Sequence, residues 1–463
     1  MMIRNILLSA TAAALLGGCA QNNVVPAPVV ATAVQENAPA APTRFQSSYL
    51  GGKVQDNWLK SFKDPTLNRL VKEGQRNNPD LRVAASRVER AIAMLNLTNT
   101  ARMPRLDVSG GYEYTNWEAA NRHDRGDIVL ALSWEPDLWG RVANAVASDA
   151  EMTVATMADF EWARQSLSAQ TARAWFLLGS DKMIYDFQKQ VLNIQRKAER
   201  ILTQQANIGS GNMRDVHMMR GMVAEARDNV QAALSTKERD ARALEILIGR
   251  YPANALKAKN LRAVTGKVPS GVPLELLNRR ADIIAAQYRV ASAFHNVQSM
   301  ALLKLPRITL GGELGADVVQ GSVSKFLSGI FMPVFDAGRI QSLIDAASAD
   351  QKAALANYQS VVFNAYREVE DALAQEKHLK YRERYLTTMV KEFKTAYNMT
   401  NENYKIGQGT ILDVLNAQSK WINARILQTQ VRKERLVNRV NLHLALGGSF
   451  DRPPVVEVVE VKK

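Results

Sequence analysis

Sulfur and imidazole side chains gather in one short stretch of this sequence, directly after a run of glycines. Met213, Met218, Met219 and Met222 surround His217 within that stretch. Thioethers are soft ligands that bind Cu(I) or Ag(I), so these residues form a candidate soft-metal site. Methionine also fills irregular gaps between packed helices, and the helical spacing of this group favours packing. The sequence leaves open whether the cluster binds a soft metal.

The remaining residues show no pattern of a catalytic or metal centre. The histidines lack paired metal spacing; they are His123, His217, His295, His378 and His443. No Gly-rich phosphate loop, nucleophile elbow or paired-carboxylate motif occurs in a convincing context. We therefore expect neither an enzyme nor a cofactor.

Cys19, the only cysteine, follows a segment with the pattern of an export signal. Residues 1–18 carry one basic side chain, Arg4, and then an apolar run that ends in Leu16-Gly17-Gly18. Small residues before a cysteine resemble a lipoprotein signal, in which the cysteine is acylated, with palmitate for example, after cleavage. Ala20 rather than Asp follows, which points to the outer membrane. The alternative is an ordinary signal with an incidental thiol.

The composition is that of a mainly helical cell-envelope protein. Hydrophobic residues make up 46% of the chain, yet no apolar run reaches the roughly eighteen residues of a transmembrane helix. A lipid chain anchors a protein without spanning the membrane. Lys and Arg outnumber Asp and Glu by 59 to 45, a formal net charge of +14. Because export excludes nucleic acid, the basic excess indicates solvated helix faces near anionic lipid, or a path for anionic cargo.

Four segments alternate apolar and polar residues with the period of a β-strand. In the first, Leu106, Val108 and Tyr112 face away from Arg105 and Asp107. The alternation predicts two hairpins, with strands at about 105–116, 126–136, 306–318 and 325–335; the last strand alternates least clearly. Tilted strands of about ten residues cross a bilayer core of roughly 30 Å, so we expect both hairpins to span a membrane.

The sequence also contains an internal duplication. The two halves align at a constant offset of 202 residues before the hairpins and 198 residues after them. The aligned pairs include Asp80 with Asp282, Pro104 with Pro306, Gly140 with Gly338, and Gly249 with Gly447. A duplication this regular predicts two equivalent structural units.

Each unit is expected to contain a helix, a hairpin, a very long helix, a turn and a returning helix. The stretch from Arg141 to Asn207 lacks proline and would form one helix of roughly 100 Å. Pairs of glycines follow both long helices and suit tight reversals, because glycine adopts positive φ without steric cost. These glycines are Gly209 and Gly211 in the first unit and Gly407 and Gly409 in the second.

The chain therefore divides into six parts. They are a lipoprotein signal peptide (1–18), a lipidated tether (19–56), the first repeat (57–250), a linker (251–272), the second repeat (273–448) and a C-terminal tail (449–463). The tether is rich in Pro, Ala, Val and Gln, which predicts an extended segment rather than a packed one.

The strand count constrains the assembly. Four strands do not close a barrel, and unpaired strand edges are not tolerated in lipid. Two chains would supply eight strands, whose interior side chains would fill, whereas three would supply twelve and leave a lumen. We therefore expect a homotrimer with pseudo-sixfold symmetry, whose long helices continue the strands as a tube.

Several short motifs, in order along nearly the whole chain, resemble the outer-membrane efflux protein family in its TolC-like, NodT-type lipoprotein branch. They include Trp58, Phe62-Lys63-Asp64-Pro65-Thr66-Leu67, Asn78-Pro79-Asp80-Leu81, Glu135-Pro136-Asp137-Leu138-Trp139-Gly140-Arg141, Asn278-Arg279-Arg280-Ala281-Asp282-Ile283, Pro333-Val334-Phe335-Asp336-Ala337-Gly338 and Leu444-Ala445-Leu446-Gly447-Gly448. Ala281 departs from the proline usual in this branch, which predicts a less sharply defined helix start there.

The resemblance implies a mainly α fold with membrane β: a trimeric twelve-stranded β-barrel that continues into a periplasmic α-helical barrel. Family members are outer-membrane ducts of tripartite efflux pumps. They dock with a periplasmic adaptor and an inner-membrane pump, here of the resistance-nodulation-division type, to export small molecules such as drugs, toxic compounds or metal ions. The glycine turns at Gly209, Gly211, Gly407 and Gly409 would then form the adaptor-docking tip.

The resemblance also places a periplasmic gate just inside that tip. The matching residues are Leu412, Asp413, Leu415 and Asn416. Three copies of Asp413 around an axis would favour cations, and the coils would separate to open. Asn416 and Ser419 depart from the Asp and Arg common at these positions, which implies a looser, less cation-selective gate. Asp413 would otherwise be an ordinary exposed helical charge.

Three other functions are open to the sequence. A duct for type I protein secretion would share every feature above. A structural helical lipoprotein would explain Cys19 and the coiled-coil pattern, but not the duplicated strands. A periplasmic adaptor would need strand-rich domains that the sequence does not show. Neither the cargo nor the pump partner follows from the sequence.

Overall fold

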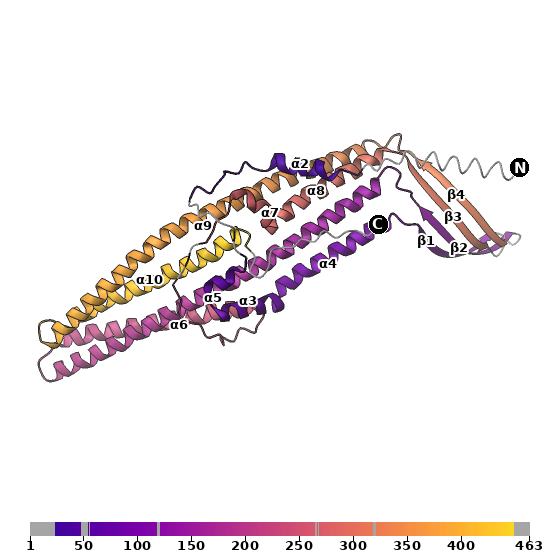
Figure 1. The fold of residues 1–463 in the computed structure, drawn as a ribbon. Helices are drawn as coiled ribbons and strands as arrows, with labels where there is room; N and C mark the ends of the chain where they lie inside the picture. The colour runs from indigo at the N-terminus through magenta and orange to yellow at the C-terminus, as the bar shows by residue number, and fades with distance from the viewer. Residues whose placement is uncertain are drawn as a thin grey trace.

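The protein is elongated, with a long bundle of helices and a β-sheet at one end (Figure 1). The computed structural model describes residues 24–47, 54, 56–117, 121–263, 266, 268–317 and 321–448. The predicted signal, Cys19 and the tail 449–463 lie outside the described residues. None of the helices in the described ranges combines the length and the low polarity that a membrane span requires.

Two units of matching design follow one another along the chain. The first contains α4 (Pro79–Thr100), β1 (Arg105–Trp117), β2 (Asn121–Trp134), α5 (Arg141–Asn207) and α6 (Met213–Leu247). The second contains α8 (Ala281–Ala301), β3 (Arg307–Asp317), β4 (Gly321–Phe331), α9 (Arg339–Lys405) and α10 (Ile411–Ala445). Helices α5 and α9 each have 67 residues, and α6 and α10 each have 35. The predicted duplicated fold is confirmed.

Short helices precede each unit and are set by local capping. A 3-10 helix (Trp58–Phe62) and α3 (Pro65–Asn77) lead into α4, and a 3-10 helix (Pro273–Glu275) and α7 (Leu276–Arg279) lead into α8. The Asp64 carboxylate caps α3 by accepting a hydrogen bond from the Thr66 amide at 2.9 Å. A blurred start at Ala281 was the wrong expectation, because α8 begins at that residue, with the Asp282 carboxylate accepting from the Ile283 amide at 3.0 Å.

Equivalent hydrogen bonds tie each returning helix to the next unit of its own repeat. The Asn78 side chain donates to the carbonyl of Leu247, the last residue of α6, at 2.9 Å. In the second repeat the Arg280 side chain donates to the carbonyl of Ala445, the last residue of α10, at 3.2 Å. Both bonds satisfy a carbonyl that has no partner inside its helix. The offsets of 202 and 198 residues thus describe contacts as well as sequence.

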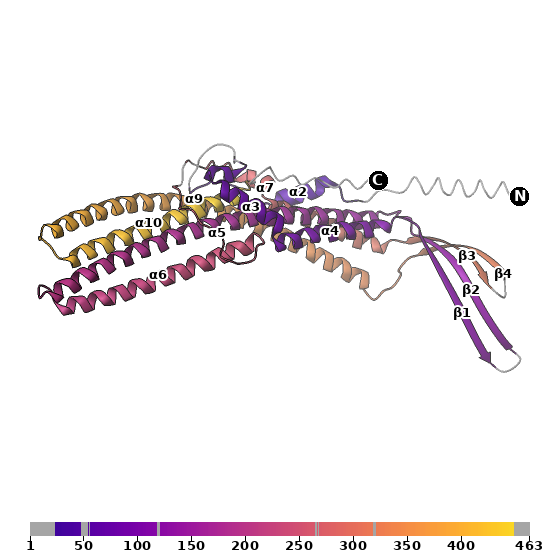
Figure 2. The ribbon, with the colours of Figure 1, turned by 90° about the horizontal axis from the view of Figure 1, so that it is seen from below.

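The strands form one antiparallel sheet in the order β1-β2-β3-β4. Arg105 pairs with Ser133, Trp134 with Leu310, and Arg307 with Phe331. Figure 2 shows the sheet projecting beyond the helices, with β1 and β4 at its two edges. One face carries an exposed apolar band, as predicted; its members include Leu106, Val108, Tyr112, Ile128, Leu314, Phe326 and Ile330.

Two strand boundaries differ from the prediction. β2 begins at Asn121 rather than at about 126, and β4 spans Gly321–Phe331 rather than 325–335. The β3–β4 ladder ends where Arg307 pairs with Phe331, because β3 starts there and offers no further partner. The apolar residues after Phe331 therefore belong to a connection, although their composition resembles that of a strand.

The N-terminal segment is packed, so the prediction of an extended tether was wrong for residues 24–47. Helix α2 (Ala27–Asn37) begins at Pro26 and buries Val30. Phe45 is 2% exposed in the core that α8, α9 and α10 share. The Glu370 carboxylate accepts from the amides of Gln46 and Ser47 at 2.7 and 2.8 Å. The apolar residues of this Pro- and Ala-rich segment gain burial on the helices, which its composition alone does not reveal.

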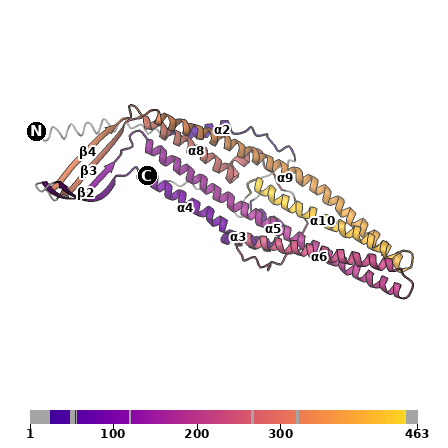
Figure 3. The same cartoon turned by 180° about the vertical axis from the view of Figure 1, so that it is seen from behind.

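Buried apolar side chains form cores at intervals along the bundle. The core of the first repeat includes Trp58, Trp175 and Leu244, and that of the second includes Ile283, Tyr358 and Leu442. A further core near the helix reversals contains the predicted seam of α6; it includes Val216, Met219, Val223, Ala226 and Val230. The cores hold α5 and α9 alongside their returning helices, so both reversals lie at the end opposite the sheet (Figure 3).

Candidate functional site

The tip is formed by two helix reversals whose glycines have different physical roles. Gly209 and Gly407 adopt φ of 76° and 81°, the left-handed region that a side chain disfavours. A Cβ on either residue would have nothing within 4 Å, so both turns present open backbone. A Cβ on Gly211 would come within 2.9 Å of the Ala206 amide nitrogen, whereas Gly409 meets only the Tyr404 nitrogen, at 3.9 Å. The turns are alike in conformation but differ in crowding.

Asp413 belongs to a capping box at the start of α10. Its carboxylate accepts hydrogen bonds from the Thr410 amide at 3.0 Å and the Thr410 hydroxyl at 2.7 Å, and the Thr410 hydroxyl accepts from the Asp413 amide at 3.2 Å. The hydrogen bonds from the Thr410 side chain and backbone lower the pKa of the Asp413 carboxyl, so it stays ionised. The Thr-x-x-Asp spacing could have revealed this role from the sequence.

The structure separates the four residues of the expected gate. Asp413 and Asn416 are exposed, one turn apart on α10, and Leu412 is half-buried. Leu415 is 3% exposed and belongs to the same core as Met219 of α6. Within one chain, therefore, the two polar residues are free to face a neighbour or a lumen, while Leu415 holds α10 against the tip core.

The tips of the two repeats differ in charge pairing. Asp215, the equivalent of Asp413, pairs with Arg214 at 3.3 Å. Leu412 occupies the position equivalent to Arg214, so Asp413 lacks the adjacent arginine that its counterpart has. The second repeat therefore supplies the less compensated negative charge at the tip.

The methionine cluster does not share one face. Met219 is fully buried in the seam of α6 and Met222 packs against the same core, which confirms packing for these two. Met213 and Met218 are 51% and 52% exposed, and His217 is exposed as well. A common soft-metal site of all five residues would require Met219 to leave the core.

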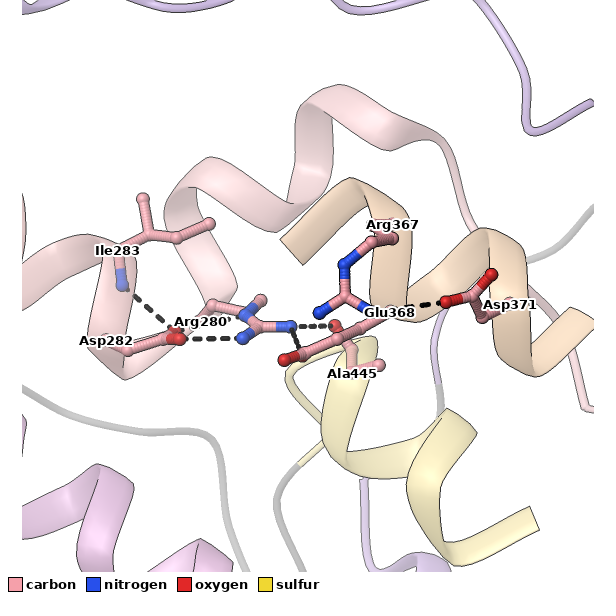
Figure 4. Close-up of polar contacts among 7 residues, drawn as sticks. All are labelled: Arg280, Asp282, Ile283, Arg367, Glu368, Asp371 and Ala445. Carbon is pink, nitrogen blue, oxygen red and sulfur yellow. Dashed lines mark hydrogen bonds and ion pairs between the residues drawn. The ribbon is translucent and has the colours of Figure 1, made fainter. Parts of the chain in front are cut away.

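A buried guanidinium joins four helices midway along the bundle (Figure 4). Arg280 is 2% exposed and binds the Asp282 carboxylate at 2.6 and 3.0 Å and the Glu368 carboxylate of α9 at 2.7 Å. Its third partner is the Ala445 carbonyl at the end of α10, and its guanidinium carbon lies 4.9 Å from the centre of the Trp162 ring of α5. We call Arg280, Asp282, Glu368, Ala445 and Trp162 the Arg280 network.

The charges of the Arg280 network compensate for its burial. Burial disfavours the guanidinium charge, but hydrogen bonds to Asp282 and the charges of Asp282 and Glu368 outweigh it and raise the pKa of Arg280. A bidentate arginine also fixes the relative orientation of α8 and α9. The sequence showed these residues only as part of a family motif; their joint burial depends on the fold.

Two acidic residues meet between α5 and α6. Asp181 and Asp240 are 8% and 9% exposed. Burial, a hydrogen bond with Asp240 and the charge of Asp240 raise the pKa of Asp181 to about 7, against the opposing charges of Lys433 and Arg239. The two carboxyls therefore share a proton at neutral pH, a feature that no sequence motif indicates.

Comparison with known proteins places this architecture among characterised relatives. The sequence matches the family described as outer membrane efflux protein over residues 70–250 and 272–448. It is 26% identical to the solvent efflux pump outer membrane protein SrpC of Pseudomonas putida, with 94% of this chain and 96% of SrpC covered. It is 27% identical to the probable outer membrane lipoprotein SilC of Salmonella typhimurium, with 97% and 100% covered. The solved outer-membrane channel OprN is similar in structure, with a TM-score of 0.81 and 26% identity over 89% of this chain and 98% of OprN.

Proposed function

Because this chain belongs to the outer membrane efflux protein family, we propose that three copies of it form the passive exit channel of a tripartite efflux pump. The protein is an outer-membrane efflux component and not an enzyme. A periplasmic adaptor and an inner-membrane pump, of the resistance-nodulation-division type, would deliver the cargo and supply the energy. The cargo class is small molecules: drugs, toxic compounds or metal ions.

The single observation that carries this proposal is the open sheet at the end of two matched long helices. The sheet has four strands, so β1 and β4 each leave one edge without a partner. An exposed edge in lipid leaves backbone groups unsatisfied, and pairing with further copies removes it. Three copies give twelve strands around a lumen, and each 67-residue helix extends roughly 100 Å from it.

We place the gate at the charged part of the tip. Three copies of Asp413, ionised and exposed, would form a ring of negative charge that favours cations. Asn416 would add three amides one turn further along, and Leu415 would anchor α10 beneath them. The open backbone around Gly209 and Gly407 supports the tip as the surface that meets the adaptor.

The packing of the N-terminal segment supports lipid attachment at Cys19. The Val25 amide donates to the Asn144 side chain at 3.3 Å, in the first turn of α5 and therefore next to the sheet. Six residues separate Cys19 from Val25 and span at most about 20 Å when extended. An acyl chain on Cys19 would thus lie close to the bilayer that surrounds the strands.

The mass of the full-length protein in detergent tests the assembly. Light scattering, corrected for bound detergent, should give three chains. A stable monomer would contradict the channel, because one open sheet encloses no lumen.

Single-channel recording in planar bilayers tests the gate. Asp413→Asn removes the charge while keeping an acceptor for Thr410, so cation preference should fall while α10 stays capped. Asp215→Asn is the matched control in the first repeat, where Arg214 already compensates the charge. Equal cation preference in Asp413→Asn and wild type would remove Asp413 from the gate.

A further inference from the structure

The connection after β4 exposes two large apolar side chains. Val334 and Phe335 are 93% and 90% exposed. This connection runs from Met332 to Gly338 and is one residue longer than its counterpart after β2, from Glu135 to Gly140. Such exposure next to an unpaired strand edge indicates a surface that another chain covers.

The junction between the two repeats shows how such an edge is closed. After β2, the Trp139 indole donates to the carbonyl of Pro306, the residue before β3, at 2.6 Å. Trp139 and Pro306 are both half-buried as a result. Between copies, the outgoing strand is β4 and the incoming strand is β1, preceded by Pro104. Pro104 is exposed in the single chain, and Ala337 stands where Trp139 would be.

The internal register predicts the register between copies. Arg105 pairs with Ser133 and Arg307 with Phe331, so the offsets of 202 and 198 residues hold inside the hairpins. The same offsets convert the pair of Trp134 with Leu310 into a pair of Met332 with Val108 of the next copy. Antiparallel pairing then continues toward the helices, with Val334 opposite Leu106 and Phe335 opposite Arg105.

A cavity lies where this register puts Phe335. Side chains alternate along a strand, so Phe335 falls on the face of Arg105 and Ser133. On that face a mainly apolar cavity of about 410 to 630 Å³ in scale is present; its own volume is about 630 Å³, and its lining includes Met103, Pro104 and Trp134. Arg307 already lies over the Phe331 ring at 5.0 Å, which shows that an arginine at the start of a strand can stack on a facing phenylalanine in this sheet.

We propose that Phe335 of one copy fills the cavity at Pro104 of the next copy and stacks on its Arg105. The longer connection after β4 lets an aromatic side chain from a second chain replace the closure that Trp139 makes within the chain. The contact rests on the proposed trimer and specifies which residues join its subunits.

Disulfide cross-linking in the full-length protein tests the register. Opposite residues of an antiparallel pair have Cβ atoms about 5 Å apart, within reach of a disulfide. Leu106→Cys combined with Val334→Cys should therefore give covalent dimers and trimers on denaturing gels after oxidation. Leu106→Cys combined with Ile330→Cys, displaced by four residues along β4, should not. Cross-linking of the displaced pair in place of the predicted one would overturn the register.

Substitution of Phe335 tests the filled cavity. Phe335→Ala should lower the temperature at which the trimer dissociates by several degrees, because a large side chain leaves an apolar cavity. Phe326→Ala is the matched control, since Phe326 is 79% exposed on the opposite face of β4. Equal dissociation temperatures for the two variants would refute the contact. A trimeric wild type with that result would leave the channel standing, whereas a monomeric wild type would overturn both proposals.

Discussion

Replacing Arg280 by alanine should destabilise the helical bundle far more than the number of lost atoms suggests. The substitution leaves the Asp282 and Glu368 carboxylates facing each other without their cation and removes the donor to the Ala445 carbonyl. It also removes the stacking on Trp162. The Arg280 network joins α5, α8, α9 and α10, so its loss affects all four helices.

The magnitude follows from the burial of each partner. Breaking a fully buried ion pair costs about 3–5 kcal/mol, because one charge is left uncompensated. The Asp282 and Glu368 side chains are 21% and 43% exposed, so water partly replaces the lost partner. We therefore expect about 3 kcal/mol, near the lower end of that range. At roughly 2 cal/mol/K of unfolding entropy per residue, a chain of 463 residues loses ~3 °C of Tm.

Arg367→Ala provides a matched control one residue before Glu368. Arg367 pairs with Asp371 at 3.3 Å, but both side chains are more than 60% exposed, at 63% and 67% (Figure 4). Exposed pairs contribute roughly 0–1 kcal/mol, so this variant should melt within about 1 °C of wild type. Thermal unfolding followed by tryptophan fluorescence compares the two variants. Equal Tm values for Arg280→Ala and Arg367→Ala would refute the argument from burial.

Further predictions concern protonation, acylation and the turns. The raised pKa of Asp181, about 7 against 3.8, means that the folded chain holds a proton that the unfolded chain loses, so stability falls as pH rises from about 4 to about 7. Asp181→Asn should therefore gain thermal stability over wild type at pH 8 and lose that gain at pH 4, and a gain independent of pH would contradict the shared proton. Cys19→Ser should abolish incorporation of labelled palmitate; continued labelling would exclude Cys19 as the attachment site. Gly447→Ala should lower Tm more than Gly407→Ala, because its Cβ would lie 2.9 Å from the Arg279 carbonyl carbon, whereas Gly407 costs only its positive φ, about 1 kcal/mol; equal melting of the two variants would argue against the close contact.

The sequence predicted the features that repeat or that depend on local chemistry. The bounds of α5, from Arg141 to Asn207, follow from a glycine before it, glycines after it and the absence of proline between. The hairpins were evident because one sheet face is apolar. Their ends were less certain, since the end of β4 depends on where β3 begins, a matter of pairing between segments.

Features that depend on contacts between distant segments were missed. The packing of α2 and Phe45 needs the surface of α8 and α9, and the Arg280 network needs four helices at once. The role of Asp413 is different, because its capping partner Thr410 is only three residues away. Local spacing was sufficient in that case, and the family resemblance drew attention to charge instead of capping.

The equal lengths of the paired helices make the bundle behave as a ruler. Helices α5 and α9 match at 67 residues and α6 and α10 match at 35, which keeps both reversals level. An insertion in one helix alone would tilt the rim and shift its seam. Inserting seven residues in all four helices preserves the seam and lengthens the tube by roughly 10 Å. The reach of this protein across a compartment is thus adjustable only in coordinated steps, which makes length a designable quantity.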